Sequence, residues 1–510
     1  MKITTFAAIY IGSYEVSLKV FEISAKQKIR SIDYVRSHVE LGKDAFGKGV
    51  IGYELVEELC LILKEFRTIM DGYKVDAYEA FAGNVFRNVG NALFILDQIR
   101  LRTKIEVTIL SNSEHRLMDY KSLAVLPKFE KMIQKGAAVV NVGGGSMQIT
   151  LFRKGTAITT QHIELGIMRI REKLTKIANM VSHYETQIQE LIDKELDIFK
   201  RIYLKGSEIK YIIVMGDYIG DMAKGFSKKE EDGTIETERF IKLLNKWYKK
   251  STEELSLELN LANEHDPLIL PSVVLYKRLS EELNAKYIWV PGVNICDGIV
   301  CDYAGKNRMI YFEHDFEEDV LAAARNLAER YQGYSSHSEA VRNMAVVIFD
   351  AMKKVHGMGK RERLLLQVAA ILHDCGRYVS LINQSECSYQ IILATEIIGM
   401  THVEREIVAS AVKYNSQPLQ PYSSVSGSMD QEGYMVVSKL AAILKIANAM
   451  DRSHRQKFKN IKASLQGREL VITVESPESI VLEKGLFPDY ANSFEEVFSV
   501  KPRIREKKVF

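Results

Sequence analysis

The sequence predicts an α/β protein with two similar lobes, followed by an all-helical domain and a small α+β domain. Strand-like apolar runs alternate with helix-like segments as far as about residue 305. Two glycine-containing turns, each between strand-like runs, lie far apart in this region. From about Phe316 the composition changes to long amphipathic helices. We therefore predict domains at 1–125, 126–305, 306–457 and 458–510.

Length and charge are those of an ordinary globular protein. The chain has 510 residues, enough for three or four domains of roughly 100–200 residues each. No apolar run is long enough to cross a bilayer, so no membrane partner is expected. A formal net charge of +3 is close to neutral at this length, which argues against a duplex nucleic-acid partner. Any polyanion would be held by a local basic patch.

The cysteines indicate a reducing compartment. There are five, an odd and sparse set without C-x-x-C spacing, which also argues against a structural zinc site. The opening residues 1–12 are typical of a strand and not of a signal peptide. We expect a cytoplasmic protein.

The first lobe opens with a hairpin. Phe6 to Ile11 and Val16 to Phe21 are predicted strands, joined by a turn at Gly12-Ser13. The polar turn Ser111-Asn112-Ser113 is expected to cap a helix that begins near Glu114. The remaining elements are predicted as helices at 50–70 and 92–100 and strands at 77–81 and 105–110.

The second lobe begins with the most informative stretch, residues 137–152, which read AAVVNVGGGSMQITLF. Gly143, Gly144 and Gly145 have no Cβ, so their backbone N–H groups can approach an anion closely, and Ser146 can add a hydroxyl donor. The turn is therefore a candidate phosphate cradle. The alternative is a glycine-rich hairpin that binds nothing. Residues 165–201 are predicted to be helical.

The C-terminal half contains a candidate metal site and, in its last residues, a predicted combination of strands and a helix. Adjacent His373 and Asp374 close an apolar helix, and His337 lies upstream. In the last residues we predict strands at 470–476 and 479–484, a turn at 485–488, a helix, and a basic tail. The tail is either a solvated terminus or one wall of a basic channel.

The order of the N-terminal motifs resembles the exopolyphosphatase/guanosine-pentaphosphatase (Ppx/GppA) family. The blocks that carry the resemblance are AAIYIGSYEVSL, FRN, ILSNSEHRL, VVNVGGGSMQ, ELGIMRIREKL and VMGD. That family belongs to the actin, sugar-kinase and heat-shock ATPase superfamily, with two ribonuclease-H-like lobes around a phosphate-binding cleft. The resemblance covers nearly the whole chain.

The resemblance implies roles for particular residues. Glu114 matches the family's general base, which activates the attacking water, and Arg87 matches the arginine that orients the end of the substrate chain. Gly12, Ser13 and Gly143 to Ser146 would hold phosphates, with Mg²⁺ or another divalent cation assisting. Without the resemblance, Glu114 is a first-turn glutamate favoured by the helix dipole and Arg87 a solvated surface residue.

Three acidic positions of the family are changed in this chain. Tyr10 stands where the family's first loop has aspartate, and Asn141 and Gln148 replace carboxylates on either side of the glycine loop. Asn and Gln keep an oxygen acceptor of similar size but lose the charge. Because Mg²⁺ is usually held by one or two carboxylates together with phosphate oxygens, metal binding is expected to be weakened.

The pair His373-Asp374, with His337, resembles the HD phosphohydrolase pattern, in which such residues hold one or two divalent metals. Asn448 occupies the place of the pattern's last aspartate, and Asp451 follows three residues later. The alternative is a structural helical domain in which these side chains are satisfied by packing and hydrogen bonds. Family members often use this domain for regulation or dimerisation, which implies a homodimer.

The leading hypothesis is hydrolysis of terminal phosphoanhydride bonds in inorganic polyphosphate or guanosine pentaphosphate, at reduced activity. A rival is a sensor that binds polyphosphate or guanosine tetra- or pentaphosphate without hydrolysing it. A third hypothesis is hydrolysis of a nucleotide at the HD-type residues. The sequence does not choose between polyphosphate and a guanosine nucleotide.

Overall fold

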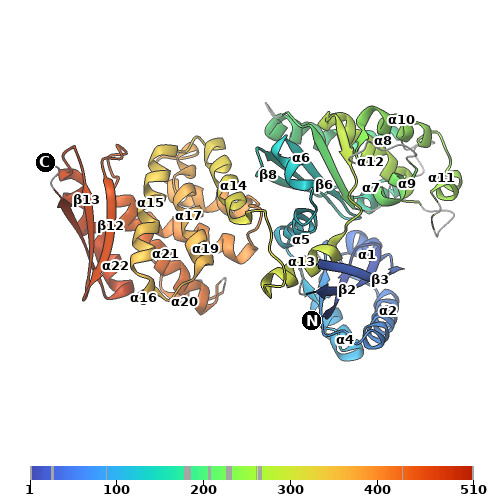
Figure 1. Cartoon of the computed structure of the whole chain (residues 1–510), viewed down its shortest axis with the longest axis horizontal. Helices are drawn as coiled ribbons and strands as arrows, with labels where there is room; N and C mark the ends of the chain where they lie inside the picture. Colours follow the sequence, from blue (N-terminus) through green and yellow to red (C-terminus); the bar gives the residue numbers. More distant parts are fainter. Residues whose placement is uncertain are drawn as a thin grey trace. The chain divides into compact units, whose positions relative to one another are not determined.

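The protein is described here from a computed structural model (Figure 1), which divides into two compact units, Met1–Asp315 and Phe316–Phe510. The residues described are 3–24, 28–87, 89–176, 185–204, 208–216, 218–225, 233–259, 261, 267–427 and 429–507. Asn88 and Asp217, which end two of the sequence motifs, lie outside them. Whether the units divide further near residues 125 and 457 stays a prediction.

The first sheet has the strand order β3-β2-β1-β4-β5. β1 pairs antiparallel with β2 and parallel with β4, and β4 continues parallel to β5. The elements of this lobe are β1 (Thr4–Ile11), β2 (Glu15–Ser24), β3 (Lys28–His38), α1 (Leu41–Lys48), α2 (Tyr53–Gly72), β4 (Ala77–Ala82), α3 (Asn84–Arg87), α4 (Ala92–Thr103), β5 (Thr108–Ile109) and α5 (Asn112–Ala124).

The second sheet repeats this arrangement. Its order is β10-β11-β9-β6-β7-β8, with β6 antiparallel to β7 and parallel to β9. The prediction of two similar lobes is therefore confirmed. The elements are α6 (Phe129–Gln134), β6 (Ala137–Val142), β7 (Met147–Arg153), β8 (Thr156–Ile163), α7 (Ile167–Thr175), α8 (Glu185–Phe199), a π-helical turn (Lys200–Leu204), β9 (Tyr211–Gly216), α9 (Ile219–Lys224), β10 (Ile235–Glu236), α10 (Thr237–Trp247), α11 (Thr252–Glu258), α12 (Ile269–Leu283) and β11 (Tyr287–Trp289).

The side chains of β1 alternate between the two faces of the first sheet, and both faces are covered by helices. Ala7 and Ile9 belong to the hydrophobic cluster that includes residues of α2 and α4. Phe6 and Ala8 point to the opposite face and pack with α5 and with α13 (Ile295–Lys306). Because successive side chains of a strand point to opposite faces, a run that is buried throughout must be covered on both sides.

The helices α5 and α13 meet at very short range. A Cβ added to Gly298 of α13 would lie 2.0 Å from the carbonyl oxygen of Met118 in α5. No side chain fits in that space, so glycine is required for the contact. This contact holds the start of α5, which bears the predicted site residue Glu114, against the first sheet.

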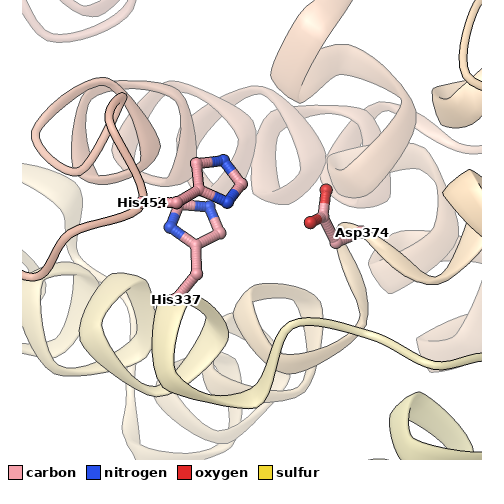
Figure 2. A group of neighbouring side chains, drawn as sticks. All are labelled: His337, Asp374 and His454. Carbon is pink, nitrogen blue, oxygen red and sulfur yellow. The ribbon is translucent and has the colours of Figure 1, made fainter.

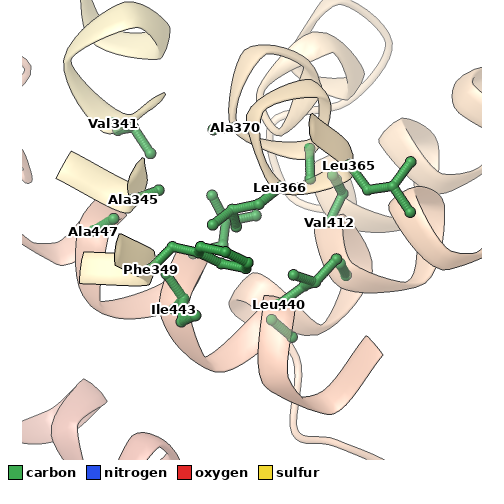
Figure 3. Packing of buried hydrophobic residues seen from close by; sticks show 14 of the residues in the cluster. Val341, Ala345, Phe349, Leu365, Leu366, Ala370, Val412, Leu440, Ile443 and Ala447 are labelled. Carbon is green, nitrogen blue, oxygen red and sulfur yellow. The ribbon is translucent and has the colours of Figure 1, made fainter. Parts of the chain in front are cut away.

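The second unit is built around one hydrophobic core (Figure 3). Phe349, Leu366 and Ile443 lie in it, and they come from three different helices. The same core includes Ile472 and Phe494 from the C-terminal strands and their helix. The elements are α14 (Phe316–Arg330), α15 (Ser335–Ala351), α16 (Lys353–His356), α17 (Lys360–Leu372), a 3-10 turn (Cys375–Tyr378), α18 (Gln384–Ala394), α19 (His402–Ser416), α20 (Tyr422–Val425), α21 (Gln431–Ala449), β12 (Lys459–Gln466), β13 (Glu469–Glu475), α22 (Val481–Phe498) and β14 (Lys501–Lys507).

The predicted strand at 479–484 and turn at 485–488 are wrong. Residues 481–488 of these segments belong to α22, which contains Pro488 in its interior. Phe487, Ala491, Phe494 and Phe498 recur at helical spacing and are buried in the core. Burial of this stripe overrides the local preference of proline for a turn. The basic tail forms the strand β14, parallel to β13.

No helix in the described part of the chain combines the length and the apolar character needed to span a membrane. The five cysteines are free. Burial raises the pKa of Cys296 and of Cys301 to about 12, so both stay protonated at neutral pH.

His356 is buried in the second unit as a neutral imidazole. Its Nε2 lies 2.9 Å from the Phe349 carbonyl oxygen, and its Nδ1 accepts a hydrogen bond from the Met358 amide at 2.9 Å. The proton therefore sits on Nε2. Burial lowers the pKa of His356, with a smaller contribution from Lys439.

The variant Gly298→Ala should destabilise the first unit, because its methyl group would overlap the Met118 carbonyl. Overpacking of this kind costs about 1–3 kcal/mol. The measurement is urea unfolding followed by tryptophan fluorescence, since Trp247 and Trp289 both lie in this unit. Gly72→Ala, where an added Cβ meets nothing within 4 Å, is the control. Equal midpoints for the two variants would contradict the close contact.

The second unit should lose stability as the medium becomes acidic. The folded-state pKa of His356 is lowered, so the stability contributed by the neutral ring is present above the unfolded pKa of about 6.5. It is lost as the pH falls through the folded-state pKa. The urea concentration at the midpoint of unfolding, followed by circular dichroism, should therefore fall less between about pH 7.5 and 5 in His356→Gln than in the wild type. The control variant His402→Gln, at an exposed histidine, should show the same change of urea midpoint with pH as the wild type. The same change in His356→Gln would disprove the assignment of His356 as a buried neutral ring.

Candidate functional site

The predicted phosphate-binding turns gather at the carboxyl ends of parallel strands. Gly12-Ser13 follows β1, Gly83-Asn84 follows β4, Leu110-Ser111 follows β5, and Gly143–Ser146 follows β6. In open α/β sheets, loops at this edge commonly form ligand sites. We call these four loops together the strand-end site.

The glycine loop directs its carbonyl groups toward α7. The amides of Ile167 and Met168, at the start of that helix, donate to the carbonyl oxygens of Gly143 and Gly144 at 3.1 and 2.8 Å. Gly166 permits this approach, because a Cβ there would lie 2.3 Å from the Ser146 nitrogen. The loop therefore caps α7, and the N-terminus of that helix is not free to bind an anion.

Two amides of the glycine loop remain open. Within the described residues, the N–H groups of Gly144 and Gly145 donate to no protein acceptor. The first lobe approaches at the same place: a Cβ on Gly144 would lie 3.2 Å from Ser13 Cβ, and one on Gly145 would lie 3.3 Å from Asn84 Nδ2. That Asn84 nitrogen is buried without a hydrogen-bond partner. The structure thus brings the predicted phosphate-binding turns together around unpaired donors.

One side of the loop is occupied by an aromatic ring. A Cβ on Gly145 would lie 2.5 Å from Phe46 Cζ, and the guanidinium of Arg169 lies 4.8 Å from the centre of the same ring. Arg169 also pairs with Glu164 at 3.0 Å. Phe46 therefore restricts the space next to Gly145.

Arg87 and Glu114 each bond a main-chain group next to the start of α5. The Arg87 guanidinium donates to the carbonyl oxygen of Leu110 at 3.0 Å. One residue later, Ser111 and Glu114 form a capping box: the Ser111 hydroxyl accepts from the Glu114 amide at 3.2 Å, and Glu114 Oε2 accepts from the Ser111 amide at 2.9 Å. Glu114 is thus a helix-capping residue as well as the predicted base, and one carboxylate oxygen is engaged in the cap.

Tyr10, Asn141 and Gln148 belong to one cluster, which also contains a buried carboxylate. Asn141 and Gln148 are directly opposite each other on β6 and β7. Asn141 Nδ2 donates to Asp119 Oδ2 at 2.5 Å, and Asp119 is only 4% exposed. The Gln148 Oε1 atom is buried without a partner. A single buried carboxylate from α5 therefore stands among the neutral replacements.

His115 joins this carboxylate to Tyr10. Its Nδ1 lies 3.1 Å from Asp119 Oδ2, at an angle too bent for a good hydrogen bond. Its Nε2 lies 2.9 Å from the Tyr10 hydroxyl. The nearby carboxylate favours a proton on Nδ1, so Nε2 accepts the phenol proton. Tyr10, His115, Asp119 and Asn141 form one polar chain through the site.

Sequence reasoning did not identify His115 or Asp119 as site residues. A signal was present, since the two residues are four apart on a predicted helix and so share one face. Asn84 had no comparable signal, because its place beside Gly145 depends on how the two lobes pack.

A separate basic cavity of about 970 Å³ lies at the other end of the second sheet. Lys135, Lys210 and Lys286 line it, just before the strands β6, β9 and β11. The lining includes none of the predicted site residues, so this cavity is distinct from the strand-end site.

The HD-type residues are brought together in the second unit. His337 Nε2 lies 3.3 Å from His373 Nε2 and 3.2 Å from Asn448 Oδ1. Asp374 Oδ1 lies 3.9 Å from His373 Nε2 and pairs with Arg377 at 2.9 Å. Asp451 Oδ2 accepts from His337 Nδ1 at 2.8 Å. The convergence of His337, His373 and Asp374 fits the prediction, while the HD-type assignment itself stays a prediction.

His454, which sequence reasoning missed, joins the same cluster (Figure 2). Its ring stacks on that of His337, with centroids 3.6 Å apart and planes 11° from parallel. Burial lowers the pKa of His373 to about 4 and also lowers that of His454, so both rings are neutral at pH 7. Burial opposes ionisation of Asp451, but hydrogen bonds from His337 and Gln456 hold its pKa below the usual value.

Two family descriptions match the chain. The Ppx/GppA phosphatase family matches residues 20–307, and the Ppx/GppA phosphatase domain III matches residues 321–488.

Curated relatives match only in part. A bifunctional 3-dehydroquinate synthase/phosphatase of Fusobacterium nucleatum is 24% identical over 285 residues, which are 54% of this chain and 39% of the relative. A guanosine-5'-triphosphate,3'-diphosphate pyrophosphatase of Aeromonas hydrophila is 24% identical over 201 residues, 38% of each protein. The matches thus span less than half the length of these relatives.

Solved structures show the same fold at low identity. An exopolyphosphatase from Cytophaga hutchinsonii is 16% identical, with a TM-score of 0.52, and the match covers 60% of this chain and 99% of that one. The crystal structure of an exopolyphosphatase-like protein gives a TM-score of 0.51 at 16% identity, covering 60% and 100%. Since the match to residues 20–307 alone covers more than half of the sequence, the chain belongs to the Ppx/GppA phosphatase family.

Proposed function

We propose that the strand-end site hydrolyses the terminal phosphoanhydride bond of inorganic polyphosphate or guanosine pentaphosphate. The observation that carries the proposal is the pair of open amides at Gly144 and Gly145, which lie beside the first-lobe turn. Backbone N–H groups that converge without a protein acceptor suit phosphate oxygens. Membership of a phosphatase family and the similarity to the guanosine-5'-triphosphate,3'-diphosphate pyrophosphatase of Aeromonas support this substrate class.

Three groups have distinct parts in the reaction. The amides of Gly144 and Gly145, with Ser13 and Ser146, hold the phosphates. Arg87, placed by its bond to Leu110, clamps the end of the substrate. Glu114 accepts the proton of the attacking water, and its cap to Ser111 fixes the carboxylate at the start of α5.

The residues present do not fit a tightly bound Mg²⁺ ion. Tyr10, Asn141 and Gln148 offer only neutral oxygens, and the one buried carboxylate of the cluster, Asp119, already accepts from Asn141. Mg²⁺ prefers ionised carboxylates and waters in octahedral geometry. We therefore assign transition-state stabilisation to Arg87 and the loop amides, and no step is assigned to a metal.

The same observation favours a second candidate function, a sensor that binds polyphosphate or guanosine tetra- or pentaphosphate without turnover. A site with open backbone amides can bind phosphate oxygens. Without carboxylates to hold a metal ion, it lacks part of the charge that would stabilise the transition state. Such a protein would bind its ligand without Mg²⁺, and the affinity would not depend on Glu114. The cytoplasmic location and the homodimer stay predictions.

Glu114→Gln should abolish phosphate release with little effect on folding. The amide oxygen of glutamine still accepts the Ser111 amide but is no base, so we expect a loss of about 10²-fold or more. The measurement is orthophosphate release from long-chain polyphosphate and from guanosine pentaphosphate, with and without Mg²⁺. Glu254→Gln is the matched control, because Ser251 and Glu254 form the same capping box on α11.

The outcomes separate the two functions. Release that disappears in Glu114→Gln and persists in Glu254→Gln supports hydrolysis. If the wild type releases no phosphate but still binds one substrate, the sensor function is correct and the hydrolase proposal fails.

Asn141→Asp should create a divalent-cation site. Two carboxylates about 2.5 Å apart repel each other, so the variant should melt below the wild type in a chelator and regain stability with Mg²⁺. Thermal melts with and without Mg²⁺ measure this. Asn91→Asp is the control, since that amide bonds both main-chain groups of Ile51 away from the site. If Mg²⁺ stabilises Asn141→Asp no more than Asn91→Asp, the role given to Asp119 is wrong.

A further inference from the structure

The basic cavity of about 970 Å³ at the amino ends of β6, β9 and β11 has no part in the proposed function. Pockets that bind small molecules usually have volumes of about 300–1,000 Å³. The lining comes from the end of α6, the π-helical turn after α8, the residues before β9, the end of α12 and the residue before β11. Segments of π-helix are rare and often lie at functional sites.

Two lysines of the lining are neighbours in the sheet. Tyr211 and Tyr287 are partners in the parallel register of β9 and β11, and the Tyr287 amide donates to the Lys210 carbonyl oxygen at 3.1 Å. Adjacent strands lie about 4.8 Å apart, so Lys210 and Lys286, which precede the two tyrosines, are side by side. Both lysines are exposed and line the cavity. Like charges at adjacent positions repel each other, and a bound anion relieves that repulsion.

The ammonium groups of these lysines lie over aromatic rings. Lys210 Nζ is 5.9 Å from the centre of the Tyr211 ring, and Lys286 Nζ is 5.2 Å from the centre of the Tyr287 ring. The two rings stack, with centroids 5.7 Å apart. The face of a ring attracts a cation but carries no net charge, so it positions each lysine without neutralising it.

The other charged groups of the lining leave an excess of positive charge. Glu282 is fully engaged, because one carboxylate oxygen accepts from Lys200 and the other from Arg278, each at 2.9 Å. Within the described residues, the remaining charged groups of the lining form no ion pairs. They are the cations Lys135, Arg201, Lys210 and Lys286 and the carboxylate of Glu208. The cavity therefore offers several positive charges to a ligand, with one acid to oppose them.

The cavity also has an apolar part. Leu204, Ile209 and Leu283 line it, and they belong to the hydrophobic core of the second lobe or pack against it. A ligand made of phosphate alone cannot cover this surface, whereas a nucleobase gains free energy by removing it from water. The ligand that suits both parts carries a ring and at least two phosphate groups.

We propose that this cavity binds a nucleoside di- or triphosphate, with its phosphates on Lys210 and Lys286 and its ring against the apolar part. The cavity lies at the opposite end of β6 from the glycine loop and shares no residue with the strand-end site. It is therefore a second ligand site, and the inference does not depend on the proposed function.

The test is a calorimetric titration of the full-length protein with adenosine triphosphate, in a chelator that removes divalent metals. The double variant Lys210→Gln/Lys286→Gln should bind about 10-fold or more weakly, because two charged contacts are lost. Lys242→Gln/Lys249→Gln is the matched control, since these exposed lysines of the same lobe lie outside the lining, and it should bind as the wild type does. Thermal melts without ligand check folding, and Lys210→Gln/Lys286→Gln should melt no lower than the wild type because a repulsion is removed.

The variant Arg87→Gln distinguishes the cavity from the strand-end site. Adenosine triphosphate binding that persists in Arg87→Gln and weakens in Lys210→Gln/Lys286→Gln supports the proposal. Binding that weakens only in Arg87→Gln, or no binding to the wild type, would overturn it.

Inorganic pyrophosphate tests the role of the apolar part. It has two phosphate groups but no ring, so we expect it to bind the wild type about 10-fold or more weakly than adenosine triphosphate does. Equal affinities would overturn the assignment of a nucleotide.

Discussion

The strand-end site depends on the approach of two stretches of main chain without a side chain between them. Gly166 lies so close to the glycine loop that any Cβ would overlap the Ser146 nitrogen. Only that approach lets α7 donate its first amides to the loop carbonyls. With its carbonyl groups fixed in this way, the loop keeps the amides of Gly144 and Gly145, which bond no protein acceptor within the described residues. A contact between main-chain groups thus determines that the loop offers N–H donors to the site, independently of any charged side chain.

The negative charge of this cluster comes from a helix and not from the strands. Tyr10, Asn141 and Gln148 on β1, β6 and β7 are neutral, and the carboxylate belongs to Asp119 on α5. That carboxylate accepts a hydrogen bond from the Asn141 amide, and the His115 ring lies 3.1 Å from it. A carboxylate in this setting acts on its protein neighbours and not on a bound cation. The short contact between Gly298 and Met118 keeps α5 in place, so packing far from the loop supports the arrangement.

Much of this was accessible from the sequence. The two hairpins with glycine turns predicted the repeated lobes, and the polar turn Ser111-Asn112-Ser113 predicted a cap for α5. The order of the motifs indicated the family. The error at α22 arose because Gly485 and Pro488 signal a turn locally, while the burial of Phe487 and Phe494 is a property of the whole core. His454 and Asn84 were missed for a related reason, since their neighbours come from distant parts of the chain.

The repeated strand order has a consequence for how the site came to be built. β1 and β6 hold the same place in their sheets, so Tyr10 and Asn141, each two residues before the turn glycine, are equivalent positions of a duplicated half. Both positions hold a neutral side chain, a phenol in one half and an amide in the other. His115 and Asp119 lie between these two positions and contact one each. One asymmetric bridge thus links two equivalent positions, which gives the two halves of a symmetric scaffold different chemical characters.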